Sequence, residues 1–497
     1  MMRNYRFFIT SLLLLLTTVA SIAQENYLLQ GCRRGTPRPQ SMQLRRGGSE
    51  GRTTGGNFYH GERHQLTILV AFNDRPFVGN EAATLEQWNK IFNAKDFTEE
   101  PFKGSVHDYF MDQSYGEFNV IFDLVYVQVS GNAKKYASTY MHDENSQYLV
   151  QDIMEVLKQD SQIDWSKYDW NNDGYINQLL IIYAGYGMND AGGSDLIWPH
   201  QWWMSEHKKD LDQDVYCDPI PVSYGEKDYL VDCYCVLAEL RNDDSYGTFG
   251  TICHEYTHCF GFPDFYYNGN KPLGNWDLMD SGNLNAGNFQ PTGYSAHERW
   301  LMGWLTPIEL KETTSIVDMP ALTDEGRAYL IRNDAYENEF YIIENRQPLG
   351  WDASLPGSGI VIFHIDYDSS IWTSTKKSPN SAICNRYDIF HANNKKFPDS
   401  EWGYPYQAND SLTNTSEPAA TLFHKNCDST LLMSKQITNM AVSGGYASFN
   451  FTVTPTTMGV KEVTTGDEQL LYRFGMLDIV RDTKGRIRKK IRNTIYR

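Results

Sequence analysis

The chain has 497 residues and a formal net charge of −18 at neutral pH. So acidic a chain is poorly suited to the phosphate backbone of a nucleic acid, which excludes nucleic acid as a partner. Hydrophobic residues make up 41% and aromatic residues 14% of the chain, enough for sizeable cores, and the length suits about two or three domains.

The N-terminal residues have the pattern of an export signal. Arg3 and Arg6 precede the apolar run 7–20, and the small residues of Ser21-Ile-Ala23 suit a cleavage site. The apolar run is too short to span a membrane comfortably. We therefore assign residues 1–23 to a signal peptide and expect a secreted protein without stable membrane insertion.

Residues 24–60 are rich in Gly, Arg and Pro. Their low apolar content cannot offset the entropy cost of folding, so this segment is interpreted as a pro-segment of a zymogen or as a disordered linker. Cys32 allows a sharper hypothesis, because a thiolate that reached a catalytic metal would hold the precursor latent. An unpaired or disulfide-bonded Cys32 is the simpler alternative.

From about residue 61, short apolar runs alternate with segments of helical spacing. The pattern predicts strands at Leu66–Phe72, Phe118–Val129 and Ile176–Gly185. It predicts a helix over Asn145–Leu157. Strands that alternate with helices indicate an α+β or α/β catalytic domain, which we place at residues 61–310.

One loop in this domain resembles the first part of a calcium-binding loop. Oxygen ligands recur at alternate positions in Asp169, Asn171, Asp173, Tyr175 (through its backbone carbonyl) and Asn177. Gly174 suits the tight turn, but Leu180 stands where an EF-hand has its bidentate glutamate. The sequence thus predicts a structural Ca²⁺ site, with an Asx-rich turn as the alternative.

The motif with the clearest chemistry is His254-Glu-Tyr-Thr-His258. Residues four apart share one face of a helix, so the two imidazoles can bind one Zn²⁺ ion. Glu255 lies beside them as the general base for a zinc-activated water. Gly261 can end the helix, and Asp264 then stands six residues after His258, where metzincin-type sites place their third ligand.

A second segment, Trp276-Asp-Leu-Met-Asp-Ser-Gly282, bears on the same site. Met279 suits a Met-turn beneath the metal. Asp277 or Asp280 could replace Asp264 as the third zinc ligand, which is the alternative within the zincin class.

Beyond the helix expected at residues 292–304, the chain becomes rich in short strands. They are predicted at Ala328–Arg332, Glu339–Glu344, Gly359–Ile365 and Ala447–Val453. We assign residues 311–455 to a β-rich C-terminal domain and residues 456–497 to a basic, solvated tail. The sequence does not indicate a function for either segment.

The eight cysteines do not form a metal-binding CxxC cluster. Cys253 and Cys259 cannot bridge each other on one helix, because the rise between them is about 9 Å. The remaining alternatives are buried free thiols, Cys384 paired with Cys427, and Cys217 paired with Cys233 or Cys235.

These motifs resemble those of the immune inhibitor A-like family of secreted bacterial metalloproteases. The family signature HExxHxxGxxD stands here as His254 to Asp264, continued by Asp264-Phe-Tyr266, and the family's Trp-Asp-Leu-Met segment stands at Trp276–Met279. Further similar segments are 104–116, 184–187, 197–200, 303–307 and 344–347. The resemblance covers about residues 65–455.

The resemblance implies a metzincin-like zinc endopeptidase with structural calcium, secreted as a precursor and acting on protein or peptide substrates. A catalytically inactive zincin-fold protein used for binding or adhesion is the alternative from another functional class. The intact Glu255 argues against it, since a site without catalysis has no need of a base.

Overall fold

A computed structural model describes residues 59–137, 145–158, 163–191, 195–207, 216–372, 378–381, 384–396 and 402–453, and the backbone of three strands between residues 468 and 491. The expected signal peptide, the segment up to residue 58 and Cys32 lie outside the described residues. Among those that are described, no helix has the length and apolar character needed to cross a membrane.

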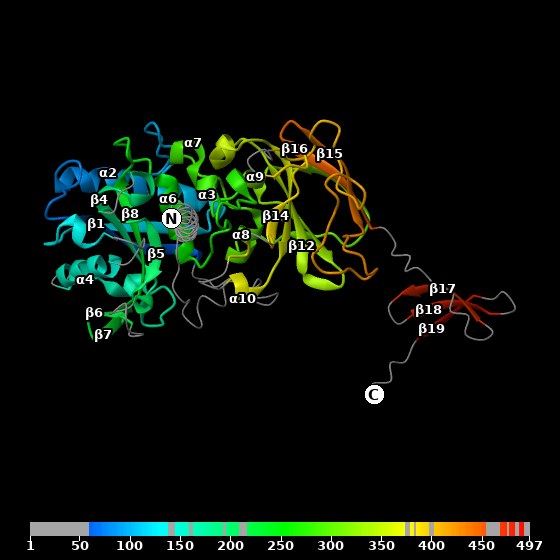
Figure 1. Cartoon of the computed structure of the whole chain (residues 1–497), viewed down its shortest axis with the longest axis horizontal. Coiled ribbons are helices and arrows are strands. Elements are labelled where there is room, and N and C mark those ends of the chain that lie inside the picture. Colours follow the sequence, from blue (N-terminus) through cyan, green and yellow to red (C-terminus); the bar gives the residue numbers. More distant parts are fainter. Residues whose placement is uncertain are drawn as a thin grey trace, which may run out of the picture.

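A five-stranded sheet forms the centre of the N-terminal half (Figure 1). Its strands, in spatial order, are β2 (Phe118–Gln128), β1 (Gly61–Ala71), β4 (Leu179–Tyr186), β8 (Cys233–Leu240) and β5 (His200–Trp203). The first four strands are parallel, and β5 runs antiparallel to β8 at the edge. The central strands are nearly continuous apolar runs because both faces of the sheet are covered.

Helices cover the two faces of this sheet. The helices are α2 (Glu81–Asn93), α3 (Val106–Gln113), α4 (Ser146–Leu157) and α6 (Phe249–Cys259), with a single turn, α5, at Met188–Ala191. Helices α2, α3 and α6 share one core with Leu69 and Ile182, whereas α4 packs on the opposite face with Ile68 and Ile181. Adjacent residues of a strand thus point to opposite faces of the sheet and pack in separate cores, as a buried parallel sheet requires.

A small sheet lies beside α4 and is built from β3 (Tyr175–Ile176), β7 (Lys227–Val231) and β6 (Ile220–Tyr224). Strand β3 pairs in parallel with β7, and β6 pairs antiparallel with it. Val231 and Ile220 from this sheet join the core on the α4 side.

Helix α6 is followed by short turns and by α8 (Ala296–Met302), within the helix expected at 292–304. Ser295 and Glu298 form a capping box at its start, and Gly303 ends it with φ 82°. The other short elements before α8 are η5 (Gly274–Trp276), η6 (Gly282–Leu284) and α7 (Asn285–Asn288).

The C-terminal half contains two packed sheets. The larger has the order β14 (Tyr387–Ile389), β13 (Gly359–Asp366), β12 (Tyr336–Arg346), β11 (Ala328–Asn333) and β9 (Ile308–Glu309). The smaller is β10 (Thr314–Met319), β16 (Tyr446–Val453) and β15 (Lys435–Ser443). Short helices α9 (Leu322–Glu325) and α10 (Ser369–Trp372) lie in the connections.

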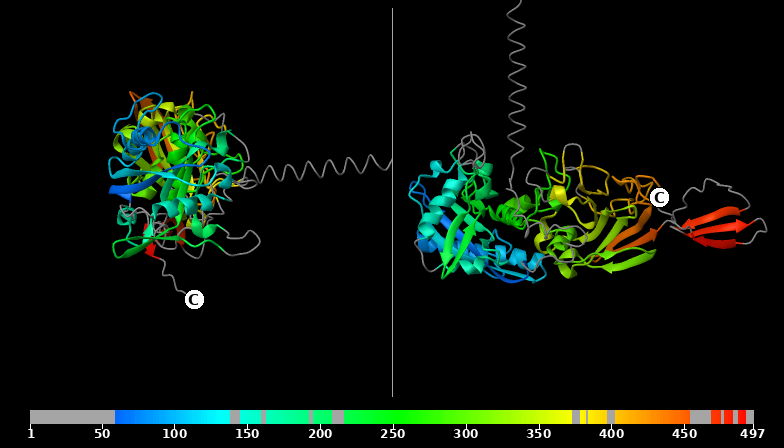
Figure 2. Two further views of the ribbon diagram at one scale, coloured as in Figure 1. Left: turned by 90° about the vertical axis from the view of Figure 1, so that its left-hand side faces the viewer. Right: turned by 90° about the horizontal axis from the view of Figure 1, so that it is seen from below.

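The larger C-terminal sheet shares its core with the N-terminal half. Along β12, Tyr341 and Ile343 face the smaller sheet, where they meet Phe449. Phe340 and Ile342 point the other way and join the same buried cluster as α6 and α8. The two halves therefore lie against each other in one elongated body (Figure 2).

The stretch that was expected to be a basic tail contains three strands. Strands β17 (Glu468–Phe474), β18 (Leu477–Asp482) and β19 (Ile487–Ile491) form an antiparallel three-stranded sheet beyond the main body (Figure 1).

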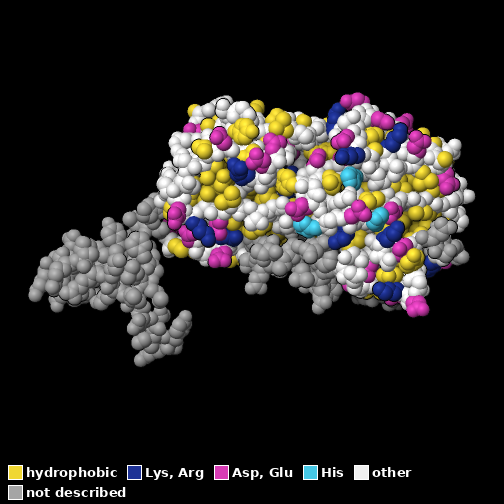
Figure 3. Space-filling view, turned by 180° about the vertical axis from the view of Figure 1, so that it is seen from behind, with side chains coloured by type: hydrophobic (Ala, Val, Ile, Leu, Met, Phe, Trp, Pro, Cys, Tyr) yellow, Lys and Arg dark blue, Asp and Glu magenta, His cyan; other side chains and the backbone are white. Residues whose placement is uncertain are grey.

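The surface of the main body carries both signs of charge. On the face shown in Figure 3, acidic and basic side chains are interspersed among apolar and uncharged groups. The net charge of −18 is not gathered into one acidic patch on that face.

Candidate active site

Helix α6 carries the His-Glu-x-x-His motif, and all of its residues are buried. Its apolar side packs into the core, and Tyr256 donates a hydrogen bond of 2.9 Å from its hydroxyl to Gln65 Oε1 on β1. Gly250 lets the helix approach the segment after the Met-turn, because a Cβ there would lie 2.0 Å from Asn283 O. The helix ends as expected at Gly261, which adopts φ 97°.

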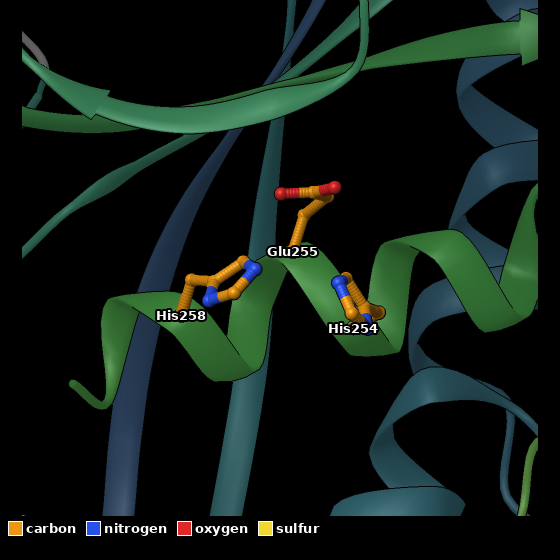
Figure 4. Close-up of side chains that lie close together, drawn as sticks. All are labelled: His254, Glu255 and His258. Carbon is orange, nitrogen blue, oxygen red and sulfur yellow. The ribbon is translucent and has the colours of Figure 1, made fainter. Parts of the chain in front are cut away.

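The two histidines lie one turn apart along α6, and the Glu255 side chain extends from the helix between their positions, with its carboxylate directed away from the two rings (Figure 4). His254 Nδ1 lies 2.8 Å from Leu278 O, and His258 Nδ1 lies 2.7 Å from Phe262 O. A carbonyl can only accept, so each Nδ1 carries the hydrogen. In the neutral imidazoles this fixes the tautomer that presents an Nε2 lone pair to a metal.

The Asp264 carboxylate lies close to both histidines. Its Oδ1 lies 3.2 Å from His254 Nε2 and 3.3 Å from His258 Nε2. Ligand atoms held about 2.0–2.1 Å from a tetrahedral zinc are about 3.3–3.4 Å apart. The two distances from Asp264 Oδ1 to the imidazole nitrogens are therefore close to those expected of ligands that share one metal ion.

The electrostatics of this cluster also favour a cation. Burial opposes charge on His254, but its hydrogen bond to Asp264 and the nearby Glu255 and Asp264 carboxylates outweigh it and raise the pKa of His254 to about 9. Burial likewise opposes ionisation of Asp264, but the His258 charge and the hydrogen bonds from both imidazoles lower its pKa to about 2. A proton or a metal ion between these groups satisfies the same negative potential.

Glu255 completes the cluster. Its side chain is buried, and one carboxylate oxygen and the two imidazoles offer atoms that all lie within 4.8 Å of one another. Glu255 follows His254 directly and therefore points about 100° around the helix from it. Its carboxylate thus reaches the edge of the site and not the centre.

The expected Met-turn contacts the site through its backbone. Met279 is fully buried, its carbonyl accepts a hydrogen bond of 2.9 Å from Phe265 N, and the neighbouring Leu278 O orients His254. The orienting carbonyls of Leu278 and Phe262 were not foreseen, since a backbone acceptor leaves no signal in residue type.

The two alternative ligands in this turn bind their own loop. Asp280 Oδ2 accepts from the amides of Leu273 and Gly274, at 3.1 and 3.0 Å. Asp277 Oδ1 accepts from Met279 N at 2.8 Å. Burial raises the pKa of Asp280 to about 7 and that of Asp277 well above its ordinary value.

The suggested calcium loop is closed by hydrogen bonds of its own. Asp169 accepts from the amides of Asp173 and Gly174, at 3.1 and 3.0 Å, and Asn177 Oδ1 accepts from Trp170 N at 2.7 Å. Asn171 Nδ2 donates to Asp173 Oδ2 at 2.8 Å. These contacts are those of an Asx-rich turn, and Gly174 adopts φ 83° within it.

No disulfide joins any of the seven cysteines that lie within the described residues. Cys259 lies on the core side of α6, where its side chain meets Cys233 and Cys235 of β8. Burial raises the pKa of Cys253 and of Cys259 well above the ordinary value, so both remain protonated. The cysteines that flank the motif thus pack behind the site as small apolar groups.

Sheet, helix and His-Glu-His cluster together have the form of a zincin-type metallopeptidase. Comparison with known proteins agrees: residues 59–305 match the family described as Immune inhibitor A peptidase M6, catalytic domain. The chain is also 29% identical over 236 residues to Immune inhibitor A of Bacillus thuringiensis subsp. alesti. That alignment covers 42% of this chain and 31% of the relative.

Residues 59–305 therefore resemble the catalytic domain of the immune inhibitor A-like metallopeptidases. This chain therefore aligns with less than a third of the length of that relative.

Proposed function

We propose that this chain is a secreted zinc endopeptidase that hydrolyses peptide bonds in proteins. His254, His258 and Asp264 hold the metal, and Glu255 is the general base. The observation that carries the proposal is the position of Asp264 Oδ1, 3.2 and 3.3 Å from the two Nε2 atoms, while both Nδ1 atoms face backbone carbonyls.

The donor set fits zinc. With hydrogen on each Nδ1, neutral imidazoles turn two Nε2 lone pairs toward a carboxylate oxygen, an arrangement that is repulsive unless a cation lies between them. Two nitrogens and one carboxylate oxygen are a ligand set found in catalytic zinc sites, which keep a further position open.

The chemistry divides between metal and protein. When bound, zinc acts as a Lewis acid that lowers the pKa of water and polarises a carbonyl. Glu255, at the edge of the cluster, accepts the proton of the attacking water and then delivers it to the leaving amine. Asp264 and the Nδ1 contacts hold the imidazoles in one orientation throughout.

Asp277 and Asp280 are weaker candidates for the third ligand. Their carboxylates accept hydrogen bonds from the amides of Met279, Leu273 and Gly274. Binding a metal through these carboxylates would break the hydrogen bonds that hold the turn together. Asp264 meets both histidines without such a loss.

Several features of the proposal lie outside the catalytic cluster. The signal-like residues 1–23 support export, and the arginine-rich segment 24–60 with Cys32 supports a latent precursor. We propose residues 61–310 as the catalytic unit and 311–455 as a β-rich region packed against it. Calcium at residues 169–177 is proposed as structural only.

The proposal is tested by metal content and proteolysis. The purified chain, freed of its N-terminal segment, should contain one zinc per molecule and cleave casein, and a chelator should abolish cleavage until zinc is restored. One bound zinc without cleavage would favour the binding or adhesion alternative. No zinc at all would refute the proposed site.

Calcium is tested separately, by melting the zinc-loaded protein with and without millimolar CaCl₂. If Asp169 and Asp173 hold calcium, the wild type should melt higher with calcium and an Asp173→Ala variant should not respond. Equal melting of the wild type in both conditions would leave the loop as a self-contained turn.

A further inference from the structure

We propose that Ser378 and Asn380, which precede β14 in the C-terminal half, are positioning residues for the third metal ligand. They hold the backbone of the loop that carries Asp264. This inference rests on the proposed zinc site and extends it to residues beyond the 59–305 segment that matches the peptidase family.

Two side chains from this segment bind consecutive carbonyls of the ligand loop. Ser378 Oγ donates to Asp264 O at 3.0 Å, and Asn380 Nδ2 donates to Phe265 O at 2.7 Å. Asn380 is fully buried, and its Oδ1 accepts from Tyr387 N on β14 at 2.9 Å. The orientation of its amide is therefore set by a strand of the larger C-terminal sheet.

The same loop is held from other directions. Phe265 N donates to Met279 O at 2.9 Å, and the Phe265 ring packs edge-on against Tyr387 with centroids 4.8 Å apart. Further along, Asn270 Nδ2 donates to Ser381 O at 2.9 Å. The loop from Asp264 to Asn270 thus lies between the Met-turn and residues 378–381 and 384–387.

Asp264 needs such support more than the histidines do. His254 and His258 are fixed to each other by the hydrogen bonds of one helix. Asp264 follows Gly261 and Pro263 in a loop, so no regular local structure sets its distance from the imidazoles. Metal ligands must lie within about 0.2 Å of the ideal distance, which makes loop placement decisive.

The matched control is Asn345. It is also fully buried in the C-terminal half, and its Nδ2 likewise donates to backbone carbonyls, here Met319 O at 3.0 Å and Gly445 O at 2.8 Å, whereas Asn380 Nδ2 donates to one. Those carbonyls lie away from the ligand loop, so Asn345→Ala reports the cost of losing a buried asparagine alone.

The experiment measures zinc affinity of the metal-stripped full chain by competition with a chromophoric chelator, beside the melting temperature of the metal-free protein. Removal of groups that orient metal ligands costs about 10- to 100-fold in affinity. We expect Asn380→Ala to lose affinity in that range, and Asn345→Ala to bind zinc as the wild type does despite lower stability. Wild-type affinity in Asn380→Ala, or an equal loss in Asn345→Ala, overturns the inference.

Ser378 supplies a second test if Asn380→Ala does not fold, because Ser378 is only half-buried. Ser378→Ala should weaken zinc binding, and Ser378→Thr, which keeps the hydroxyl, should restore it. Equal affinity of the two variants overturns the inference. A wild type that takes up no zinc refutes the proposed function itself, whereas a zinc-binding wild type with unaffected variants refutes only the role of Ser378 and Asn380.

Discussion

Replacement of Asp264 by alanine tests the third ligand directly. Structural zinc sites with four protein ligands bind with about 10–16 kcal/mol, or about 2.5–4 kcal/mol per ligand. Asp264 Oδ1 is the atom that lies 3.2 and 3.3 Å from the two Nε2 atoms, so its removal deletes one whole ligand. The two imidazoles keep their carbonyl contacts and retain a weaker site.

We therefore expect Asp264→Ala to weaken zinc binding by about two to three orders of magnitude, at about 1.4 kcal/mol per tenfold. The assay is chelator competition on metal-stripped protein near neutral pH. Asp277→Ala is the control: it removes the acceptor of Met279 N, so it should lower stability by about 1 kcal/mol with little change in zinc affinity. Retained zinc in Asp264→Ala with loss in Asp277→Ala would refute the assignment.

Two further predictions concern the frame around the site. Burial raises the pKa of Asp280 to about 7, so the folded chain holds a proton that the unfolded chain has released above about pH 4. Raising the pH from about 5 to 7 should thus lower the free energy of unfolding of the wild type by up to ~1.4 kcal/mol per pH unit. In urea unfolding, Asp280→Asn should not show that loss. A difference in unfolding free energy between the two proteins that does not change with pH would contradict this prediction. Gly250→Ala places a Cβ 2.0 Å from Asn283 O, so it should destabilise the metal-free protein by about 1–3 kcal/mol in thermal unfolding; a variant as stable as the wild type would show that α6 can shift.

Local patterns predicted the parts of the fold that local physics determines. The strand expected at Leu66–Phe72 corresponds to β1, and the helix expected at Asn145–Leu157 corresponds to α4. Helix α3 was missed although its capping box, Ser105 with Asp108, is visible in the sequence. Strand β8 was missed because a short, unbroken apolar run does not distinguish a buried strand from a buried helix.

The site was predictable as a set of residues and not as a geometry. The spacing of His254, His258 and Asp264 pointed to one cluster, and the structure brings the three together. The contact between Asp264 and Ser378 joins residues 114 positions apart. No periodicity or motif encodes such a pairing, because it depends on how the larger C-terminal sheet packs against the catalytic half.

The central claim is tested most directly by comparing Glu255→Gln with the wild type, both zinc-loaded and freed of the N-terminal segment. Glutamine keeps the shape of Glu255 but accepts no proton, and a general base is worth about 10²–10⁴-fold in rate. We predict one zinc per chain in both proteins and a loss of casein cleavage within that range in the variant. A zinc-loaded Glu255→Gln that cleaves casein at the wild-type rate would contradict the account.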